Sequence, residues 1–108
     1  DAQCQAAIEF SRQTKVVVVL KGRHTLITDG HTAVWNQTGT PAMAVAGSGD
    51  VLTGLITALI CQGLGPRDAA HLAVFAHGRA AELAQRELNS HVVLPTELIA
   101  HIPPLLAK

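Results

Sequence analysis

The sequence predicts an α/β fold in which helices pack on a small sheet, and three observations predict it. Residues 15–22, KVVVVLKG, hold four consecutive valines without polar alternation, which is typical of a strand buried on both faces in a helix-covered parallel sheet. Residues 25–35, TLITDGHTAVW, follow as two further short strands. From residue 48 onward, apolar residues recur at helical spacing almost to the end of the chain.

The composition indicates one globular unit, 1–108, that acts on a small molecule. Of the 108 residues 48% are apolar, and eight basic and eight acidic residues give a formal net charge of zero. Neither charge sign forms a run, so we expect no nucleic-acid partner and no membrane partner. Cys4 and Cys61 lack CxxC spacing, which indicates reduced thiols. With no membrane-length apolar run and no leader, we expect a cytoplasmic protein.

The first third of the chain is expected to form a helix and three strands. Helical spacing of apolar residues predicts a helix that reaches about Arg12. For the strand at 16–20 we expect parallel neighbours on both sides. The dipeptide Asp29-Gly30 favours a tight hairpin between the next two strands, because it readily adopts positive φ angles. A loop at 36–46 then leads to the helices.

Two long helices and a divided tail are expected after that loop. The first spans about 48–62 and ends at Gly63, which can adopt the left-handed conformation that closes a helix. The second, at about 66–88, has proline at its first position. Its alanines let neighbouring backbones approach closely: Ala69, Ala70, Ala73, Ala76, Ala80, Ala81 and Ala84. The tail at 94–106 is expected to form two short helical turns, divided at Pro103-Pro104.

The expected sheet is too small for a strand that is buried on both faces. About three strands precede a chain that is helical to its end, whereas such a strand needs neighbours on both sides. We therefore expect the chain to be the C-terminal part of a larger α/β domain, or to complete its sheet by association. A homo-oligomer is the expected form of that association.

The segment AGSGDVLTG, at 46–54, is the first candidate for a functional site. Gly47 and Gly49 let the backbone approach a ligand, and a helix that begins there presents unpaired N–H groups to an anion such as phosphate. Asp50 would then act as a general base on a hydroxyl that attacks a phosphoryl group. An ordinary helix cap is the alternative interpretation of these residues. The segment matches neither a P-loop nor GxGxxG.

The segment LKGRHT, at 20–25, is the second candidate. It places Lys21, Gly22 and Thr25 just beyond the carboxyl end of the apolar strand, where open α/β sheets bind ligands. A lysine after a strand is more often a solvated strand end. Two phosphate-compatible loops in one short chain favour the functional interpretation.

Other candidates carry less weight. The six histidines show no ligand pair at i, i+4, and His71 and His77 point to different helix faces, so we expect no metal ligated directly by the protein. His77 is expected to pack between helices or to lie at the substrate's edge. Trp35 and Phe75 are expected in the core. Ser48 has no histidine at a nucleophile spacing that would indicate a hydrolase.

Four segments together resemble one family. They are LKGRHT, the block NQTGTPAMAVAGSGDVLTGLITALICQGLGPRDAA, HGRAAELA and ELIAHIPPLL. They are similar to the C-terminal part of the ADP- or ATP-dependent NAD(P)H-hydrate dehydratases, within the ribokinase-like superfamily, and they cover nearly the whole chain. The resemblance implies a three-layer ribokinase-like fold, of which the chain would hold a C-terminal portion with few strands and several helices, the N-terminal part of the domain being absent.

The resemblance also implies a repair reaction and its site residues. Hydrated NADH or NADPH would be phosphorylated on its ring hydroxyl by ADP or ATP with Mg²⁺, and loss of phosphate would restore the cofactor. Asp50 would be the base that binds this substrate. The anion hole would consist of Ala46, Gly47, Ser48 and Gly49, with Gly49 also touching the nucleotide. The nucleotide-binding segment would be Lys21, Gly22, Arg23, His24 and Thr25. Asn36 would belong to the Mg²⁺-phosphate region.

Two other functions stay open at this point. A ribokinase-like small-molecule kinase shares the glycine, glycine, aspartate pattern of residues 47–50 and would leave a stable phosphorylated product. A non-catalytic nucleotide-binding fragment would bind ADP whether or not Asp50 is present. The sequence does not distinguish ADP from ATP as the phosphoryl donor.

Overall fold

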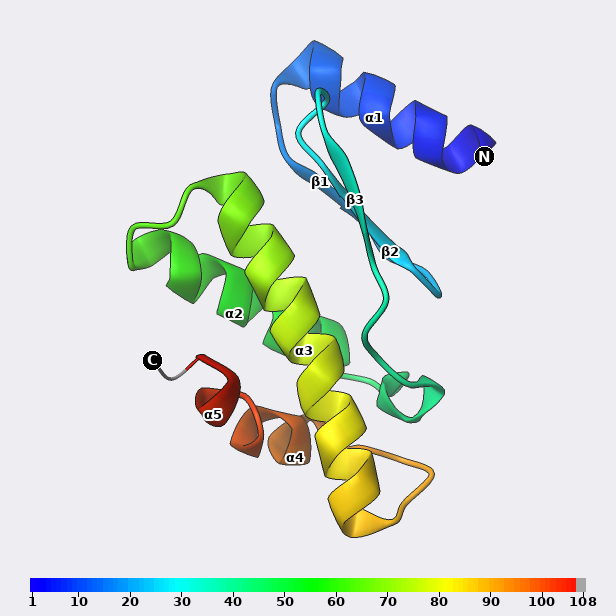
Figure 1. Cartoon of the computed structure of the whole chain (residues 1–108), viewed down its shortest axis with the longest axis vertical. Coiled ribbons are helices and arrows are strands. Elements are labelled where there is room, and N and C mark those ends of the chain that lie inside the picture. The colour runs from blue at the N-terminus through cyan, green and yellow to red at the C-terminus, as the bar shows by residue number, and fades with distance from the viewer. Residues whose placement is uncertain (107–108) are drawn as a thin grey trace.

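The computed structural model describes residues 1–106 and shows a three-stranded sheet with helices on both sides (Figure 1). Its elements follow in chain order: α1 (Ala2–Thr14), β1 (Val18–Leu20), β2 (Thr25–Thr28), β3 (Ala33–Asn36), the 3₁₀ helix η1 (Pro41–Met43), α2 (Ser48–Cys61), α3 (Pro66–Leu88), α4 (Pro95–Ala100) and α5 (Pro103–Leu106). The mixed α/β class expected from the sequence is confirmed. None of the helices within residues 1–106 combines the length and the hydropathy that a membrane span requires.

The sheet separates α1 from the long helices. In Figure 1, α1 lies on one side of the strands, and α2 and α3 lie on the other. The cross-strand row Val19, Ile27 and Val34 faces the long helices, because Ile27 packs in a core cluster with residues of α2 and α3. On the opposite face, Leu26 is paired with Trp35 and is buried to 1% exposure. The sheet is thus the middle of three layers.

The expected parallel pairing of β1 is wrong within the described chain. β1 pairs with β2 in antiparallel register, and β2 pairs with β3 in the same way, giving the order β1-β2-β3. All three residues of β1 are only half-buried. β1 is half-buried because it is an edge strand: within residues 1–106 no strand pairs with its other edge, and its apolar side chains are covered incompletely.

The turn between β2 and β3 is longer than the two-residue hairpin expected from Asp29-Gly30. It spans four residues, because Thr28 pairs with Ala33. The carboxylate of Asp29 accepts hydrogen bonds from the N–H groups of His31 (2.9 Å) and Thr32 (2.7 Å). These backbone bonds lower the pKa of Asp29 to about 2. Among the four turn residues, 29–32, only Gly30 has positive φ, at 91°.

The two long helices match their predicted bounds closely. α2 ends before Gly63, which has φ of 107°, and α3 begins at a proline. The alanines expected to allow close packing are all buried, at 2% exposure or less: Ala69, Ala70, Ala73, Ala76, Ala80, Ala81 and Ala84. α3 consequently packs closely against α2 along one side and against the sheet along another.

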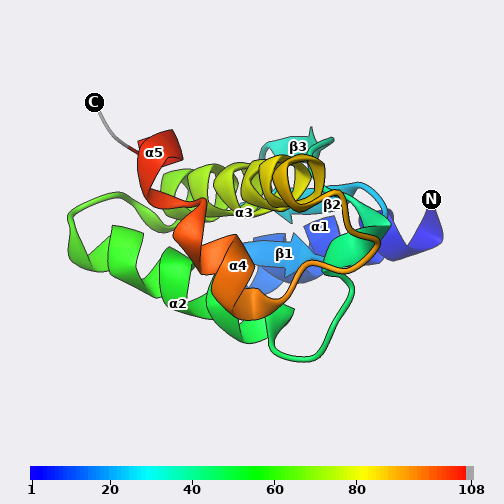
Figure 2. The same cartoon turned by 90° about the horizontal axis from the view of Figure 1, so that it is seen from below.

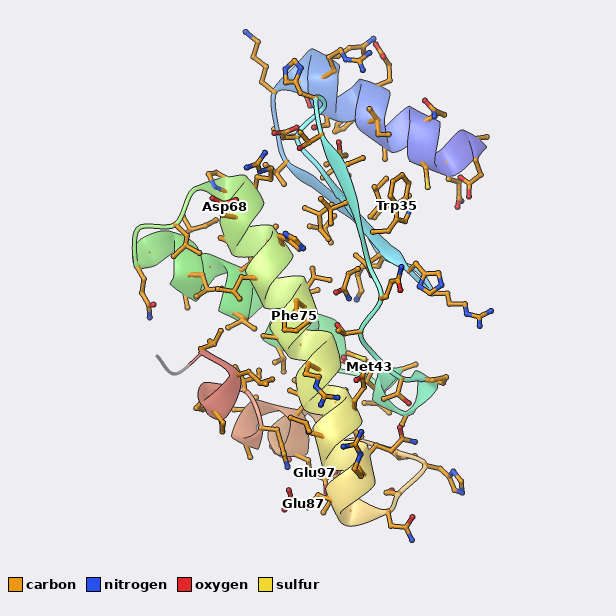
Figure 3. The ribbon with its side chains drawn as sticks, viewed as in Figure 1. Trp35, Met43, Asp68, Phe75, Glu87 and Glu97 are labelled. Atoms are coloured by element: carbon orange, nitrogen blue, oxygen red, sulfur yellow. The ribbon has the colours of Figure 1, made fainter. Side chains whose placement is uncertain are left out.

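The tail folds back under α3. α4 and α5 are divided at Pro103 as expected, and Figure 2 shows α4 next to α2 and α3, and α5 next to α3. Val93, Leu98 and Ile102 form a second core cluster with the last alanines of α3. A different expectation is wrong: Trp35 and Phe75, labelled in Figure 3, are 48% and 44% exposed. The sheet face and helix face that carry them have too little of the described chain packed against them.

Candidate functional site

A cavity of about 850 Å³ lies where both sequence-predicted loops meet the helices. Its walls come from the segment after β1, the loop after β3, the start of α2 and the middle of α3. It brings together predicted site residues that are distant in sequence: Lys21, Gly22, Arg23, His24, Thr25, Asn36, Ser48 and Gly49. Ala46, Gly47 and Asp50 are exposed at the start of α2 and are not among the residues that line this cavity.

The first turn of α2 presents free backbone donors. Gly47 is the N-cap residue, with φ of 96° and no side-chain hydrogen bond that closes the helix. Within residues 1–106, the N–H groups of Ala46, Gly47, Gly49 and Asp50 have no hydrogen-bond partner, whereas that of Ser48 donates to the Val45 carbonyl at 3.2 Å. Free N–H groups at the positive end of a helix dipole form an anion-binding site.

Lys21 lies directly over this helix start. A Cβ added to Gly49 would be 3.1 Å from Lys21 Nζ, so the absence of a side chain at Gly49 lets the ammonium group approach the backbone. A cation close to the positive end of a helix is unfavourable unless an anion lies between them. The two loops therefore converge on one place whose electrostatics suit a phosphate.

Asp50 is located beside this anion site and is not engaged in closing the helix. Its side chain is exposed in the first turn of α2, and it makes no hydrogen bond to any residue of the described chain. The N-cap of α2 is Gly47, and Asp50 is an acid of the first turn, where the helix dipole also favours a carboxylate, so the cap interpretation stays open beside the catalytic one. A free carboxylate one residue after the anion donors can accept a proton from a bound ligand.

Asn36 is engaged within its own loop. Its side chain is buried, and its Nδ2 donates to the Thr38 carbonyl (3.2 Å) and to Thr38 Oγ1 (3.0 Å). Thr38 Oγ1 also lies 3.0 Å from the Phe75 carbonyl of α3. Asn36 thus shapes the loop that forms one wall of the cavity.

Sequence reasoning missed how firmly this loop is fastened to α3. A Cβ at Gly78 would lie 2.3 Å from Thr38 Oγ1, so only glycine allows the loop to cross the helix there. Further along, the Gly39 N–H donates to Glu82 Oε2 at 2.7 Å, and the Glu82 carboxylate also pairs with Arg79 at 2.9 Å. A glycine within an alanine-rich helix was the available signal, since it costs helix stability without a packing reason.

His77 connects the middle of α3 to the start of α2. Its side chain is 5% exposed, and its Nε2 lies 3.0 Å from the backbone carbonyl of Ser48 and 3.4 Å from Ser48 Oγ. Burial lowers the pKa of His77, the hydrogen bond to Ser48 raises it in part, and the charge of Lys21 lowers it further. A neutral imidazole that donates from Nε2 satisfies this geometry.

The comparisons with known proteins show the family of this chain. The family described as NAD(P)H-hydrate dehydratase matches residues 1–104. The chain belongs to this family. A crystal structure of the Bacillus subtilis ADP/ATP-dependent NAD(P)H-hydrate dehydratase, co-crystallised with ATP/Mg²⁺, is 35% identical and superposes with a TM-score of 0.85 over 95% of this chain. That likeness confirms the ribokinase-like fold expected from the resemblance, of which this chain covers a portion.

Curated relatives of this family member are longer than the chain. The bifunctional NAD(P)H-hydrate repair enzyme of Pyrobaculum aerophilum is 44% identical over 85% of this chain and 18% of its own length. The ADP-dependent (S)-NAD(P)H-hydrate dehydratase of Bacillus subtilis is 38% identical over 94% of this chain and 37% of its own length. The chain thus spans between about a fifth and two fifths of these two relatives.

Proposed function

We propose that this chain carries the phosphoryl-transfer side of an NAD(P)H-hydrate dehydratase, which removes water from hydrated NADH or NADPH. The observation that carries the proposal is the start of α2, where free backbone N–H groups lie beneath Lys21 and next to the free carboxylate of Asp50. Family membership over residues 1–104 supports the same reaction. That the chain is the C-terminal part of a ribokinase-like domain stays a prediction.

In the proposed reaction, Asp50 takes the proton from the ring hydroxyl of the hydrated cofactor. The hydroxyl oxygen forms a bond to the terminal phosphorus of ADP or ATP, and the bond from that phosphorus to the nucleotide's bridging oxygen breaks. The free N–H groups of Ala46, Gly47 and Gly49 stabilise the charge on the transferred group, whereas that of Ser48 is held by the Val45 carbonyl. Release of that phosphate from the ring, together with a ring proton, then restores the nicotinamide.

The nucleotide would occupy the cavity beside this helix start. Lys21 and Arg23 offer charge to its phosphates, while Gly22, His24 and Thr25 complete the same wall. The Bacillus subtilis relative was co-crystallised with ATP/Mg²⁺, which supports ADP or ATP as the donor here.

A magnesium ion fits this wall when the phosphates provide its ligands. No carboxylate is found among the described residues that line the cavity, and Asn36 binds Thr38, so protein oxygens offer it few direct ligands. When bound, Mg²⁺ supplies positive charge to the phosphate oxygens. Asn36 contributes by holding the loop that faces the phosphates.

The setting of the reaction follows from the proposed substrate. A small, soluble cofactor is the partner, and we place the protein in the cytoplasm, where both cysteines would remain free thiols as in the structure. Association of identical subunits is proposed to cover the half-buried β1 edge.

A spectrophotometric assay tests the proposal against the kinase alternative. Hydrated NADH, Mg²⁺ and either ADP or ATP are incubated with the chain, and with a chimera in which it replaces the matching segment of the Bacillus subtilis dehydratase. Nucleotide-dependent recovery of dihydronicotinamide absorbance, with one phosphate released per molecule restored, is the expected result. A stable phosphorylated hydrate without recovery would indicate a kinase. ADP binding without either product would indicate a non-catalytic module.

A further inference from the structure

The buried histidine of α3 touches a peptide group that belongs to the anion site. The acceptor of the His77 Nε2 hydrogen bond is the carbonyl of Ser48, at 3.0 Å. That carbonyl and the N–H of Gly49 are the two ends of one peptide unit, which is planar and trans. Anything that fixes the direction of the Ser48 carbonyl therefore fixes the direction of the Gly49 N–H, which points the opposite way.

The Gly49 N–H is one of the donors available to a phosphate. It has no partner within the described chain, and Lys21 Nζ lies 3.1 Å from the position of a Cβ on that residue. A hydrogen bond to the carbonyl end of a peptide also polarises its N–H end and makes it a stronger donor. Lys21, Gly49 and His77 also line the same cavity.

We propose that His77 is a positioning residue, which orients and polarises the Ser48–Gly49 peptide so that its N–H binds the phosphate of the nucleotide. The inference rests on the proposed function for the identity of the anion. His77 acts through the peptide and does not need to touch the reacting atoms. Its other ring nitrogen makes no hydrogen bond to any residue of 1–106.

The geometry favours this role over simple helix packing. Alanines make up most of the buried face of α3, so helix packing there relies on small apolar side chains. A histidine at this place instead brings one N–H donor to a carbonyl at the start of the neighbouring helix. Burying an imidazole has a desolvation cost that its hydrogen bond only offsets, so a purely structural role gains little from it.

Three substitutions at His77 separate the effect of its N–H donor from the effect of its side-chain packing. In H77Q the amide nitrogen can reach the position of Nε2 and keep the bond, whereas H77L removes the donor at similar size. In H77N the side chain is too short for its amide to reach the Ser48 carbonyl. This variant also removes the donor and replaces H77L in the comparison if H77L folds poorly. H71L, on an exposed position of the same helix, is the matched control.

The experiment follows the Gly49 amide by ¹⁵N–¹H NMR while the intact chain is titrated with sulfate, a dianion that does not titrate near neutral pH. We expect the Gly49 resonance to move with sulfate in the native chain and in H71L. The sulfate dissociation constant should rise about tenfold in H77L and H77N and return to within about threefold of native in H77Q. ADP titrations should show the same order.

Two results would overturn the inference: a Gly49 amide that does not respond to sulfate in the native chain, or one that responds equally in H77L and H77N. The readout needs no turnover. If the Gly49 results follow the expected order but hydrated NADH is not repaired, the positioning role stands and the proposed reaction is the part that fails.

Discussion

The helical region and the sheet region of this chain bury their apolar side chains to different degrees. Along α3, the seven alanines of the predicted packing face are at most 2% exposed. On the sheet side, Phe10 and Trp35 are 56% and 48% exposed, and β1 is only half-buried. The alanine face of α3 is thus covered within the described chain, whereas the sheet side leaves apolar surface that these residues do not cover. The candidate site lies where the two regions meet.

The difference in burial indicates which region contributes most to the stability of the chain. Buried apolar area stabilises roughly in proportion to its extent, so the helical region and the residues that join it to the sheet should dominate the free energy of unfolding. Exposed aromatic residues of the sheet should contribute little. The substitutions below test that contrast, in order of decreasing effect.

The largest expected effect follows truncation at the junction. Ile27 is 2% exposed and packs between the sheet and α2–α3, so I27A should lower the free energy of unfolding by about 2–5 kcal/mol. W35A removes a larger side chain, but one that is 48% exposed, and should cost roughly 1–2 kcal/mol. Urea denaturation measures both. A larger loss of unfolding free energy in W35A than in I27A would contradict the expected difference between the exposed sheet surface and the buried junction.

A smaller effect is expected where the loop crosses α3. G78A would place its Cβ 2.3 Å from Thr38 Oγ1 and 2.7 Å from the Thr38 carbonyl, and should destabilise the chain by about 1–3 kcal/mol. G54A is the matched control, because Gly54 is exposed in α2 and has no atom within 4 Å of an added Cβ. G54A should stabilise by up to about 1 kcal/mol, since alanine favours a helix. Equal changes in the melting temperature of G78A and G54A would contradict the close passage of the loop over α3 at Gly78.

The smallest effect concerns the tail. His101 Nε2 lies 2.9 Å from Glu87 on α3, and hydrogen bonds to the Glu97 carbonyl and to Glu87 raise the pKa of His101. A raised histidine pKa gives stability that is fully present below the unfolded value of 6.5 and is lost as pH rises through the folded value.

H101Q should therefore lower the melting temperature more at pH 5.5 than at pH 8.5. The contribution is about 0.5 kcal/mol or less, because Glu87 is 71% exposed and water screens the pair. His77 has the opposite sign, since its lowered pKa reduces stability as pH falls, but it is present in both chains. A pH-independent cost of H101Q would show that the pair does not titrate with folding.

Local signals predicted the helices well. Gly63 and the proline that opens α3 set the bounds of the two long helices, because both residues act through their own backbone conformation. The glycines before Asp50 likewise predicted a helix start with free donors. These features depend on a few consecutive residues, which a sequence displays directly.

The features that were missed depend on contacts between distant segments. The antiparallel pairing of β1 and the exposure of Trp35 depend on which elements cover the sheet. The bond from His77 to Ser48 joins residues 29 positions apart, and the fit of Gly78 under Thr38 requires the path of the loop. The spacing of apolar residues along the sequence does not indicate contacts between distant segments, so these features are seen only in the folded chain.

Replacement of Asp50 by asparagine tests the central claim most directly. D50N keeps the size of the side chain and removes the base, so ADP affinity should stay within about threefold of native. Recovery of dihydronicotinamide absorbance by the chimera should fall by about 10²–10⁴-fold. D68N, which changes the first-turn acid of α3 instead, is the control and should match the native rate. Turnover by D50N equal to that of D68N would contradict the account.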